Sequence, residues 1–452
     1  MPAPPRRTVV VGGGIAGLTA ARVLAAAGRA VVVLEGSPRV GGKLLTGEVA
    51  GVQVDLGAES MLARRPEGVE LAHGLGLHVV HPATTSSSVW TRGELRPLPR
   101  SVMGVPADVE QVARSGVLSD AGVARLRHEA SGRALPDGED VSVDELVATR
   151  LGNEVVDRLV EPLLGGVYAG HARLLSARAT VPQLVAWSGE RSLVGAAAQS
   201  SSTASGPVFA GISGGLGRLP GALADGLEVR TGAPVRELRR TPTGFALVVG
   251  PTAAPREVLA DEVVLATPAA PTARLLTDLA PVAAAELAAV EHASMAIVTL
   301  AFRAGDLPDL PGSGFLVPPI DGRTIKAATF SFAKWDWVRE AGDGLLLLRT
   351  SVGRHREESV LQVSDDDLVA RSLADLSDAT GLAAGPVDSR VQRWGGALPQ
   401  YAVGHLDRVA RIRADVARVP GLAVCGAAYD GVGIPAVIAS ARRAATTLTQ
   451  AQ

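Results

Sequence analysis

The sequence predicts an α/β protein of two or three domains. Its 452 residues are more than a single hydrophobic core usually organises. Near the N-terminus a glycine motif lies between two apolar segments, a pattern typical of a strand–helix–strand unit with parallel strands. The middle of the chain shows helical spacing, and later segments read again as strands. Together these observations predict an α/β architecture of several parts.

The first unit has the sequence of a dinucleotide-binding motif. Residues 8–11 are apolar on both faces and predict a buried strand, which is followed by Gly12, Gly14 and Gly17 at GxGxxG spacing and a helix to about residue 27. Gly12 permits a tight turn, Gly14 lets the backbone approach a pyrophosphate, and Gly17 lets the helix lie close to the strand. The free N–H groups and the dipole at the helix start can then hold two phosphates.

A carboxylate completes this motif. Residues 30–34 predict a second buried strand that ends at Glu35, about 20 residues past the glycines, where an acid suits a ribose hydroxyl pair. The carboxylate would repel a 2′-phosphate. An ordinary glycine-rich turn is one alternative, and a secretory signal after Arg6 and Arg7 is another. The three glycines at 12–14, Arg22 and Glu35 argue against the signal.

A second glycine turn, in combination with the first, favours a flavin over a plain nicotinamide. Gly36, Arg39, Gly42 and Lys43 can face phosphate or the polar edge of a flavin ring, although a surface turn is the alternative. The turn at residues 57–60 would pass near the isoalloxazine. A closing helix after residue 431 could place its positive dipole at the electron-accepting edge of the flavin; the alternative is a terminal packing helix.

The residues expected to contact the cofactor share a place in glycine turns or at the ends of neighbouring strands. They are Gly12, Gly14, Ile15, Ala16, Gly17, Glu35, Gly36, Arg39, Gly42, Lys43, Gly57, Ala58, Glu59, Ser60, Val235, Thr267, Gly426, Val432, Gly433 and Ile434.

The rest of the chain predicts a helical region and further sheets. Strands are expected at residues 53–56, 227–230, 234–238, 245–249, 257–260, 261–268, 296–302, 324–330, 344–350 and 422–426, and a hairpin at 89–95. Helices are expected at residues 66–77, 143–152, 154–161, 281–290 and 365–380. Pro162 is expected to end the helix before it, and residues 198–206 are expected to form a mobile loop.

Composition excludes several classes of function. The net charge is −2 with the signs evenly mixed, so no nucleic-acid footprint is visible. Cys425 is the only cysteine, which excludes an internal disulfide, a cysteine zinc site and an iron–sulfur cluster, and fits a reducing compartment. The eight histidines lack metal-site spacing, so no metal is expected. No uninterrupted apolar run reaches the roughly 20 residues that span a bilayer. These features predict a cytoplasmic protein, at most peripheral to the membrane.

Several segments together resemble one family, the FAD-dependent protoporphyrinogen and coproporphyrinogen oxidases of the amine-oxidase-like flavoprotein superfamily. The resemblance covers nearly the whole chain, and the segments that carry it are residues 57–65, 95–99 with 103–106, 161–170, 401–405 and 425–435. Two positions depart from the family pattern: His171 stands where Asp is often found, and Val437 where Cys is often found.

The resemblance implies a p-hydroxybenzoate-hydroxylase-like architecture with non-covalent FAD. It implies oxidation of a porphyrinogen to a porphyrin in three two-electron steps, with O2 as acceptor and H2O2 released. The composition resembles that of high-GC Gram-positive bacteria, where the family typically acts on coproporphyrinogen III; protoporphyrinogen IX stays an open alternative. The expected domains are FAD-binding (1–60, 207–280, 406–452), substrate (61–99, 281–405) and helical cap (100–200).

The substrate of this family carries carboxylates, so basic residues are expected to meet it. Arg64 and Arg65 are the first candidates, with a solvated loop pair as the alternative. Lys326 and Arg349 are weaker candidates. Gly166 could let the macrocycle approach the backbone, and Tyr168 could wall the pocket. Because the flavin carries the redox step, no catalytic side chain is expected.

Two other functions remain open from the sequence. The first is an amine oxidase or a carotenoid-desaturase relative, although the three tyrosines of the chain give little material for the paired aromatics of amine oxidases. The second is a flavoprotein that binds a tetrapyrrole without turning it over. Hand-off of the product to a ferrochelatase is an expected partnership that the resemblance suggests.

Overall fold

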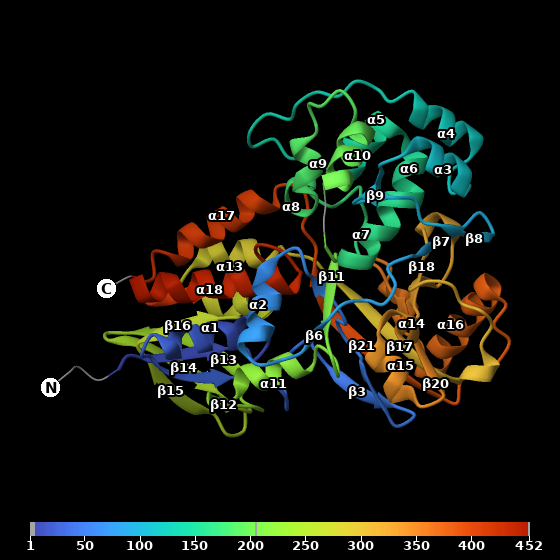
Figure 1. The fold of residues 1–452 in the computed structure, drawn as a ribbon. Helices are drawn as coiled ribbons and strands as arrows, with labels where there is room; N and C mark the ends of the chain where they lie inside the picture. Colours follow the sequence, from blue (N-terminus) through green and yellow to red (C-terminus); the bar gives the residue numbers. More distant parts are fainter. Residues whose placement is uncertain (1–4, 204–205, 451–452) are drawn as a thin grey trace.

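The structure, a computed structural model, describes residues 5–203 and 206–450. Three groups of elements surround a central region (Figure 1). A parallel sheet with its helices lies on one side, a large mixed sheet lies on the other, and a cluster of helices lies above the mixed sheet. The expected α/β class is confirmed, whereas the domain boundaries stay a prediction.

The parallel sheet contains the N-terminal glycine motif. Its strand order is β12-β2-β1-β16-β22, with bounds β12 Glu228–Arg230, β2 Ala30–Leu34, β1 Arg7–Val11, β16 Glu262–Leu265 and β22 Leu422–Val424. All neighbouring strands pair in parallel. Thus segments from the start, middle and end of the chain meet in one sheet.

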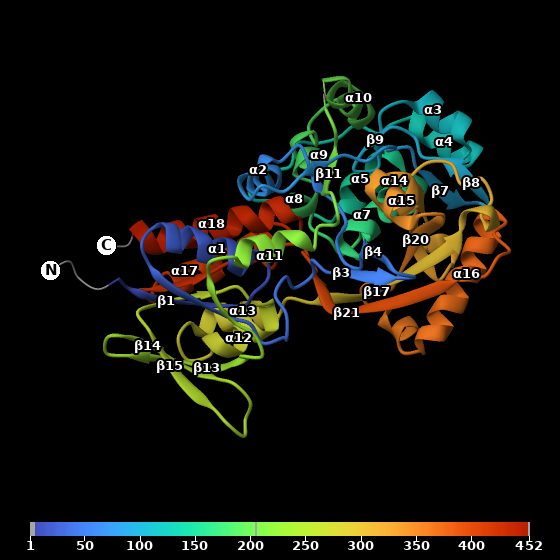
Figure 2. The same ribbon diagram turned by 60° about the horizontal axis from the view of Figure 1, so that its bottom comes forward.

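Helices cover one face of this sheet, and a small sheet together with further helices covers the other. Val10 points into a core shared with α1 (Ile15–Ala26) and α18 (Ile434–Gln450), which lie side by side in Figures 1 and 2. Val9 and Val11 point into the opposite core, which β13 to β15 and the helices α12, α13 and α17 complete. The bounds are β13 Val235–Thr241, β14 Gly244–Val249, β15 Arg256–Ala260, α12 Ala269–Leu276, α13 Pro281–Ala288 and α17 His405–Val416.

The mixed sheet has the order β21-β17-β20-β19-β18-β7-β8. Its bounds are β21 Asp388–Pro399, β17 His292–Arg303, β20 Leu345–Val352, β19 Ile325–Thr329, β18 Gly314–Leu316, β7 Ser88–Thr91 and β8 Glu94–Pro97. The hairpin β7–β8 turns at Arg92 and Gly93, which both have positive φ (55° and 78°), as a tight two-residue turn requires. Helix α16 (Asp365–Thr380) begins at a Ser364–Asp367 capping box and packs its apolar residues on this sheet.

Short elements connect these bodies. They are β3 Thr46–Val49, β4 Val52–Asp55, β5 Met61–Leu62, α2 Pro66–Gly74, β6 Val79–Val80, β9 Ser101–Val102, β10 Val105–Pro106, β11 Phe209–Ile212, α11 Arg218–Ala224, α14 Ser331–Lys334 and α15 Asp336–Gly342. Among the described residues, no helix is both long and apolar enough to cross a membrane.

The helical cluster corrects two expectations. Its bounds are α3 Val109–Ser115, α4 Asp120–Arg127, α5 Val143–Leu151, α6 Asn153–Val155, η1 Val156–Val160, α7 Glu161–Tyr168, α8 Ala177–Thr180, α9 Pro182–Ala186 and α10 Leu193–Thr203. Pro162 does not end a helix, because the wide π turn η1 precedes it and the helical run continues through α7. Residues 198–203 are helical rather than a loop; residues 204–205 lie outside the described part.

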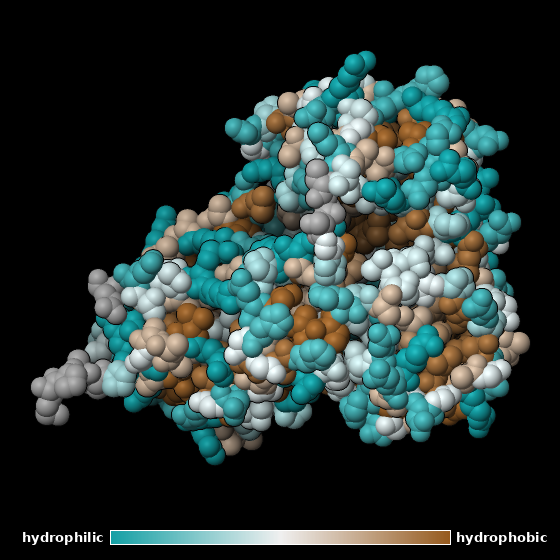
Figure 3. Space-filling model, viewed as in Figure 1, coloured by the Kyte–Doolittle hydropathy of each residue, from teal (hydrophilic) through white to brown (hydrophobic). Residues whose placement is uncertain are grey.

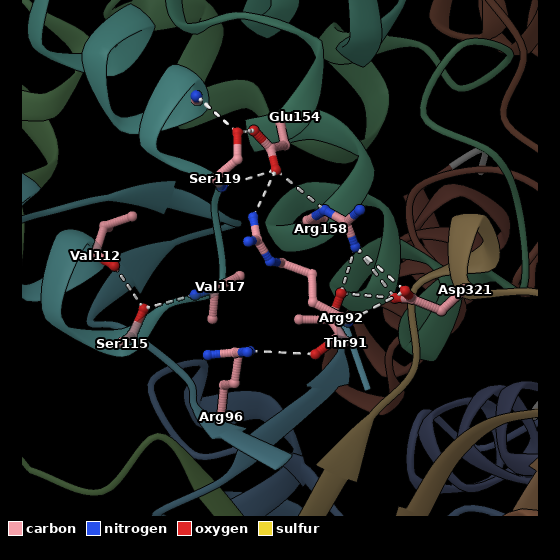
Figure 4. Close-up of polar contacts among 11 residues, drawn as sticks. Thr91, Arg92, Arg96, Val112, Ser115, Val117, Ser119, Glu154, Arg158 and Asp321 are labelled. Carbon is pink, nitrogen blue, oxygen red and sulfur yellow. Dashed lines mark hydrogen bonds and ion pairs between the residues drawn. The ribbon is translucent and has the colours of Figure 1, made fainter. Parts of the chain in front are cut away.

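A polar network joins the helical cluster to the mixed sheet (Figure 4). On η1, Arg158 donates to the Thr91 hydroxyl (2.5 Å) and pairs with Asp321 (3.3 Å). The same guanidinium also contacts Glu154 (3.3 Å), whose other oxygen accepts from the Ser119 hydroxyl (2.7 Å). One side chain therefore ties the π turn before α7 to the sheet.

Arg158→Ala is expected to lower the free energy of unfolding by about 2–3 kcal/mol, because it leaves the largely buried Asp321 without its cation. Chemical denaturation at neutral pH measures the loss. The matched control is Arg127→Ala, which removes an exposed ion pair with Glu110 and should cost less than about 1 kcal/mol. Equal losses in both variants would show that the network has no special role.

Candidate functional site

The three motif glycines have distinct geometric roles. Gly12 has φ 108°, and an added Cβ would lie 2.9 Å from the Ala266 carbonyl oxygen. Gly14 has φ −75°, and its added Cβ would meet nothing within 4 Å. At Gly17 an added Cβ would lie 1.8 Å from the Gly12 carbonyl oxygen, so helix α1 packs directly on the turn. Gly12 and Gly17 are therefore needed by the fold, whereas Gly14 keeps a space open.

Glu35 is held in place at the end of β2. Its carboxylate oxygens accept from the backbone N–H of Gly13 (2.6 Å) and of Ser37 (2.8 Å). Both bonds fix the carboxylate beside the start of α1. This is the place that the ribose role requires.

The second turn lies directly on the first. The N–H of Gly41 donates to the Gly13 carbonyl (2.8 Å), and an added Cβ at Gly42 would lie 3.5 Å from Gly14 Cα. The Arg39 guanidinium donates to the Gly42 carbonyl (2.8 Å), so this side chain shapes the turn. Burial lowers the pKa of Lys43 to about 8. A desolvated cation in the turn that packs on Gly14 suits an anionic cofactor.

A buried ionic cluster fixes the third turn, residues 57–60. Glu59 pairs with Lys334 (2.6 Å) and with Arg349 (3.2 Å), and Arg349 also donates to the Gly57 carbonyl (2.8 Å). Burial raises the pKa of Glu59, but the attraction of Arg349 and Lys334 outweighs burial and leaves the pKa below its ordinary value. Glu59 is therefore an anion that holds the turn to β20 and α14.

The remaining cofactor candidates lie around the carboxyl ends of the parallel strands. Val235 begins β13, and Thr267 follows β16, where its hydroxyl contacts that of Thr272 (2.8 Å). Gly426 follows β22, and its added Cβ would lie 4.0 Å from Ala16 Cβ. Val432 and Gly433 precede α18, which begins at Ile434. Ala58 is half-buried beside Lys43, to whose carbonyl it donates (3.3 Å).

These features fit a flavin dinucleotide. No side chain caps the first N–H groups of α1, whose N-cap is Gly14, and the space over Gly14 is open. The side chain of Lys43 is largely desolvated. The starts of α1 and α18 and the ends of the parallel strands adjoin one another, where α/β sheets bind such ligands. The residues could hold the pyrophosphate at α1 and the ribose at Glu35.

The substrate candidates fall into different surroundings. Arg64 and Arg65 are exposed before α2, and Arg65 pairs with Glu67 (2.6 Å). Arg349 is engaged by Glu59, as described above. Lys326 is buried in β19, and Tyr168 is buried at the end of α7, where burial raises its pKa to about 12. The structure thus separates the arginine pair at 64–65 from the buried candidates.

Gly166 lies on the exposed side of α7, opposite β18. An added Cβ would lie 3.9 Å from Leu316 Cδ2, in ordinary contact. Figure 3 shows an apolar hollow at this level, between the helical cluster and the mixed sheet.

His171 replaces the expected Asp with a different set of contacts. Its ring lies 3.4 Å from a carboxylate oxygen of Glu161 and 3.4 Å from one of Glu357. A hydrogen bond to Glu161 raises the pKa of His171, and burial opposes this only in part. His171 therefore joins the end of α7 to the loop after β20, and this contact is structural.

His405 is buried and neutral in the fold. Its ring stacks on Tyr401 at 3.9 Å and its Nε2 donates to the Tyr429 carbonyl (3.1 Å). Burial lowers the pKa of His405 to about 4. A depressed folded pKa gives stability that is complete above the unfolded pKa of about 6.5 and is lost as the pH falls toward 4.

We therefore expect the free energy of unfolding to drop by about 3 kcal/mol between pH 7 and pH 4 through His405 alone. Urea denaturation at several pH values measures this, and His405→Gln should flatten that part of the profile. His128→Gln, at an exposed histidine, serves as the control and should leave the profile unchanged. An unchanged profile in His405→Gln would contradict the assignment.

Sequence reasoning missed three residues of this region. Lys334 pairs with Glu59, Trp394 donates from Nε1 to the Leu56 carbonyl (3.2 Å), and Arg354 is buried in the loop after β20. A basic residue or a Trp at a strand end is a weak signal, because such residues also line ordinary surfaces. Their roles emerge only from the pairing of distant segments.

Comparison with known proteins finds similarity along almost the whole chain. The model of the flavin containing amine oxidoreductase family matches residues 15–449. The coproporphyrinogen III oxidase of Mycobacterium tuberculosis is 39% identical, covering 99% of this chain and 98% of that protein. The coproporphyrinogen III oxidase of Bacillus subtilis is 32% identical, covering 95% of each.

Solved structures show the same fold. A crystal structure from an Exiguobacterium species, provisionally named a protoporphyrinogen oxidase, has a TM-score of 0.87 at 31% identity and covers 99% of both chains. Cyclohexylamine oxidase from Brevibacterium oxydans has a TM-score of 0.72 at 17% identity and covers 99% of both chains, a likeness of fold alone.

Proposed function

The chain belongs to the FAD-dependent porphyrinogen oxidases of the flavin-containing amine oxidoreductase family, and we propose that it oxidises coproporphyrinogen III to coproporphyrin III. It is a flavin-dependent oxidoreductase with FAD as its cofactor. When bound, FAD supplies the two-electron redox chemistry, with O2 as the final acceptor and H2O2 released. Protoporphyrinogen IX is a second substrate to be tested.

The main support for this proposal is the open space over Gly14 at the start of α1. Turn 57–60 connects this region to the mixed sheet, because Arg349 of β20 donates to the Gly57 carbonyl. The first turns would bind the dinucleotide. Glu59, through Lys334 and Arg349, would hold the third turn against the substrate side. The apolar hollow between the helical cluster and the mixed sheet would receive the macrocycle and exclude water from it.

One assay separates this proposal from its alternatives. Purified protein that carries FAD is mixed with coproporphyrinogen III without oxygen, and air is then admitted. Fast growth of porphyrin fluorescence above the non-enzymatic rate is the expected result. Bleaching of the flavin by an amine alone would indicate an amine oxidase, and tight binding without turnover would indicate a carrier. Repeating the assay with protoporphyrinogen IX measures the substrate preference.

The cellular setting is proposed on the resemblance. The proposed location is cytoplasmic, with at most peripheral membrane contact. Hand-off of the porphyrin to a ferrochelatase is a further proposal. Fractionation of cells and a pull-down with purified ferrochelatase test these two statements.

A further inference from the structure

Two buried cations, one on the mixed sheet and one in the loop that follows a neighbouring strand, have no acidic partner within 4 Å in the described part of the chain. Lys326 in β19 is 2% exposed, and Arg354 in the loop after β20 is 5% exposed. Across residues 5–203 and 206–450, the structure shows no carboxylate within 4 Å of either charged group. Burial, and to a smaller extent repulsion by the Arg354 charge, lowers the pKa of Lys326 to about 7.

Both side chains keep donors unused. Lys326 Nζ donates to the Gly353 carbonyl (2.9 Å) and lies 3.9 Å from the Met295 sulfur. Arg354 donates from Nη2 to the Val317 carbonyl (2.9 Å), and its buried Nε has no partner. An ammonium has three N–H donors and a guanidinium five, so most of this capacity is free. Buried cations left in this state are costly unless a ligand supplies the negative charge.

The nearest acids are engaged elsewhere. Glu161 accepts from the N–H of Ala172 (2.7 Å) and contacts His171 (3.4 Å). Glu357 contacts the other side of the same histidine (3.4 Å). These carboxylates attract Arg354 from a distance, but burial still lowers the pKa of Arg354. They hold the loop to α7 and do not neutralise the pair.

The pair lies between the third glycine turn and α7. Met295, beside Lys326, faces Trp394 across β17 and β21, and the Trp394 ring lies 3.2 Å from an added Cβ at Gly57. On the other side, Arg354 binds the carbonyl of Val317, the residue after Leu316, which adjoins Gly166. The N–H of His355 donates to the Ala169 carbonyl (2.7 Å) and so holds the loop that contains Arg354 against the end of α7.

We propose that Lys326 and Arg354 form a carboxylate subsite that binds one propionate of the porphyrinogen. The proposal rests on the proposed function and deepens it by naming the group that the site recognises. An ammonium and a planar guanidinium can share the two oxygens of one carboxylate. Anchored there, the macrocycle lies against Gly166 with its rim toward turn 57–60. Arg64 and Arg65, exposed before α2, are then not needed for this carboxylate.

The test compares binding of coproporphyrin III with binding of its tetramethyl ester, which has the same ring without charges. Protein carrying FAD is titrated with each porphyrin in the same detergent, and fluorescence gives the two dissociation constants. Wild type should prefer the acid. In Arg354→Met and in Lys326→Met we expect this preference to fall at least tenfold, because each variant removes one charge and keeps a long apolar side chain.

Arg356→Met is the matched control, since Arg356 is 59% exposed and pairs with Glu291 (2.9 Å). It should leave the preference unchanged. An undiminished preference in both test variants, or an equal loss in the control, would overturn the subsite. If Arg354→Met does not fold, Arg354→Lys and Lys326→Met provide the test, and the lysine variant should keep more of the preference than Lys326→Met.

Failure of the two proposals can be told apart. The titration needs no turnover, so a loss of acid preference supports the subsite even if the oxidase assay fails. Conversely, fast oxidation of coproporphyrinogen III by wild type, with an unchanged KM in both test variants, would keep the oxidase and reject the subsite.

Discussion

Gly14→Val is expected to give a folded protein that has lost its flavin, with FAD affinity reduced on the order of 100-fold or more. Gly14 has φ −75°, which any residue adopts, and an added Cβ meets no protein atom within 4 Å. The backbone conformation and the added Cβ are therefore compatible with the fold. It occupies the space that the pyrophosphate needs at the start of α1.

The measurement is the visible absorption of the purified variant, together with its thermal unfolding. Gly305→Val is the matched control, since its added Cβ also meets nothing within 4 Å and it lies in an exposed turn. Gly17→Ala should instead prevent stable folding, because its Cβ would lie 1.8 Å from the Gly12 carbonyl oxygen. A Gly14→Val protein with full flavin would show that the pyrophosphate lies elsewhere.

Glu59→Ala is expected to lower the free energy of unfolding by about 3–5 kcal/mol and to loosen flavin binding. Lys334 and Arg349 would remain largely buried without their shared counter-charge, which is more costly than losing a surface pair. Turn 57–60 would also lose its link to β20 and α14. Urea denaturation and the rate of FAD release on dilution measure the two effects.

The pH profile gives an independent check. The folded pKa of Glu59 is lowered, so its stabilising effect is present above the unfolded value near 4.5 and is lost as the pH falls through the folded pKa. Glu59→Gln should remove this acid-dependent part. The matched control is Glu67→Ala, which breaks the more exposed pair with Arg65 and should cost about 1 kcal/mol or less.

Much of the fold could be predicted because local signals and packing agree. The strands at residues 8–11 and 30–34 are apolar on both faces, and glycines mark the turn between them. The helices that begin at Pro281 and Asp365 have a proline and a capping box at their starts. Where such signals coincide, the structure confirms the element to within a few residues.

Two errors arose where packing overrides a local signal. A proline such as Pro162 usually marks a helix end, but here a π turn directly precedes it and the helical run continues through α7. The serines of α10 suggested a loop, yet Leu193 and Ala197 pack in the helical core and Glu129 accepts from the N–H of Leu193 at the start of α10 (2.6 Å). Neither effect is visible in a short window of sequence.

The site was harder to predict than the fold because side-chain direction depends on register. The pairing of β19 with β20 is irregular between Ile325 and Ala327, which is where Lys326 lies. Alternation along the strand therefore does not tell where its ammonium points. Likewise the sequence alone suggests that Arg349 is an unpaired cation available to a ligand. Only the structure shows that it forms an ion pair with Glu59.

The order of the parallel sheet constrains how the protein is made. Its central strand β1 lies between β2 and β16, and β16 lies against β22, which ends at Val424. Synthesis proceeds from the N-terminus, so more than half of the chain must be made before β16 can pair with β1. Long waits of this kind slow folding and leave apolar edges uncovered. A nascent chain that stalls before β22 would present an unfinished sheet to chaperones, and the final thirty or so residues decide whether the molecule becomes competent to take up its cofactor.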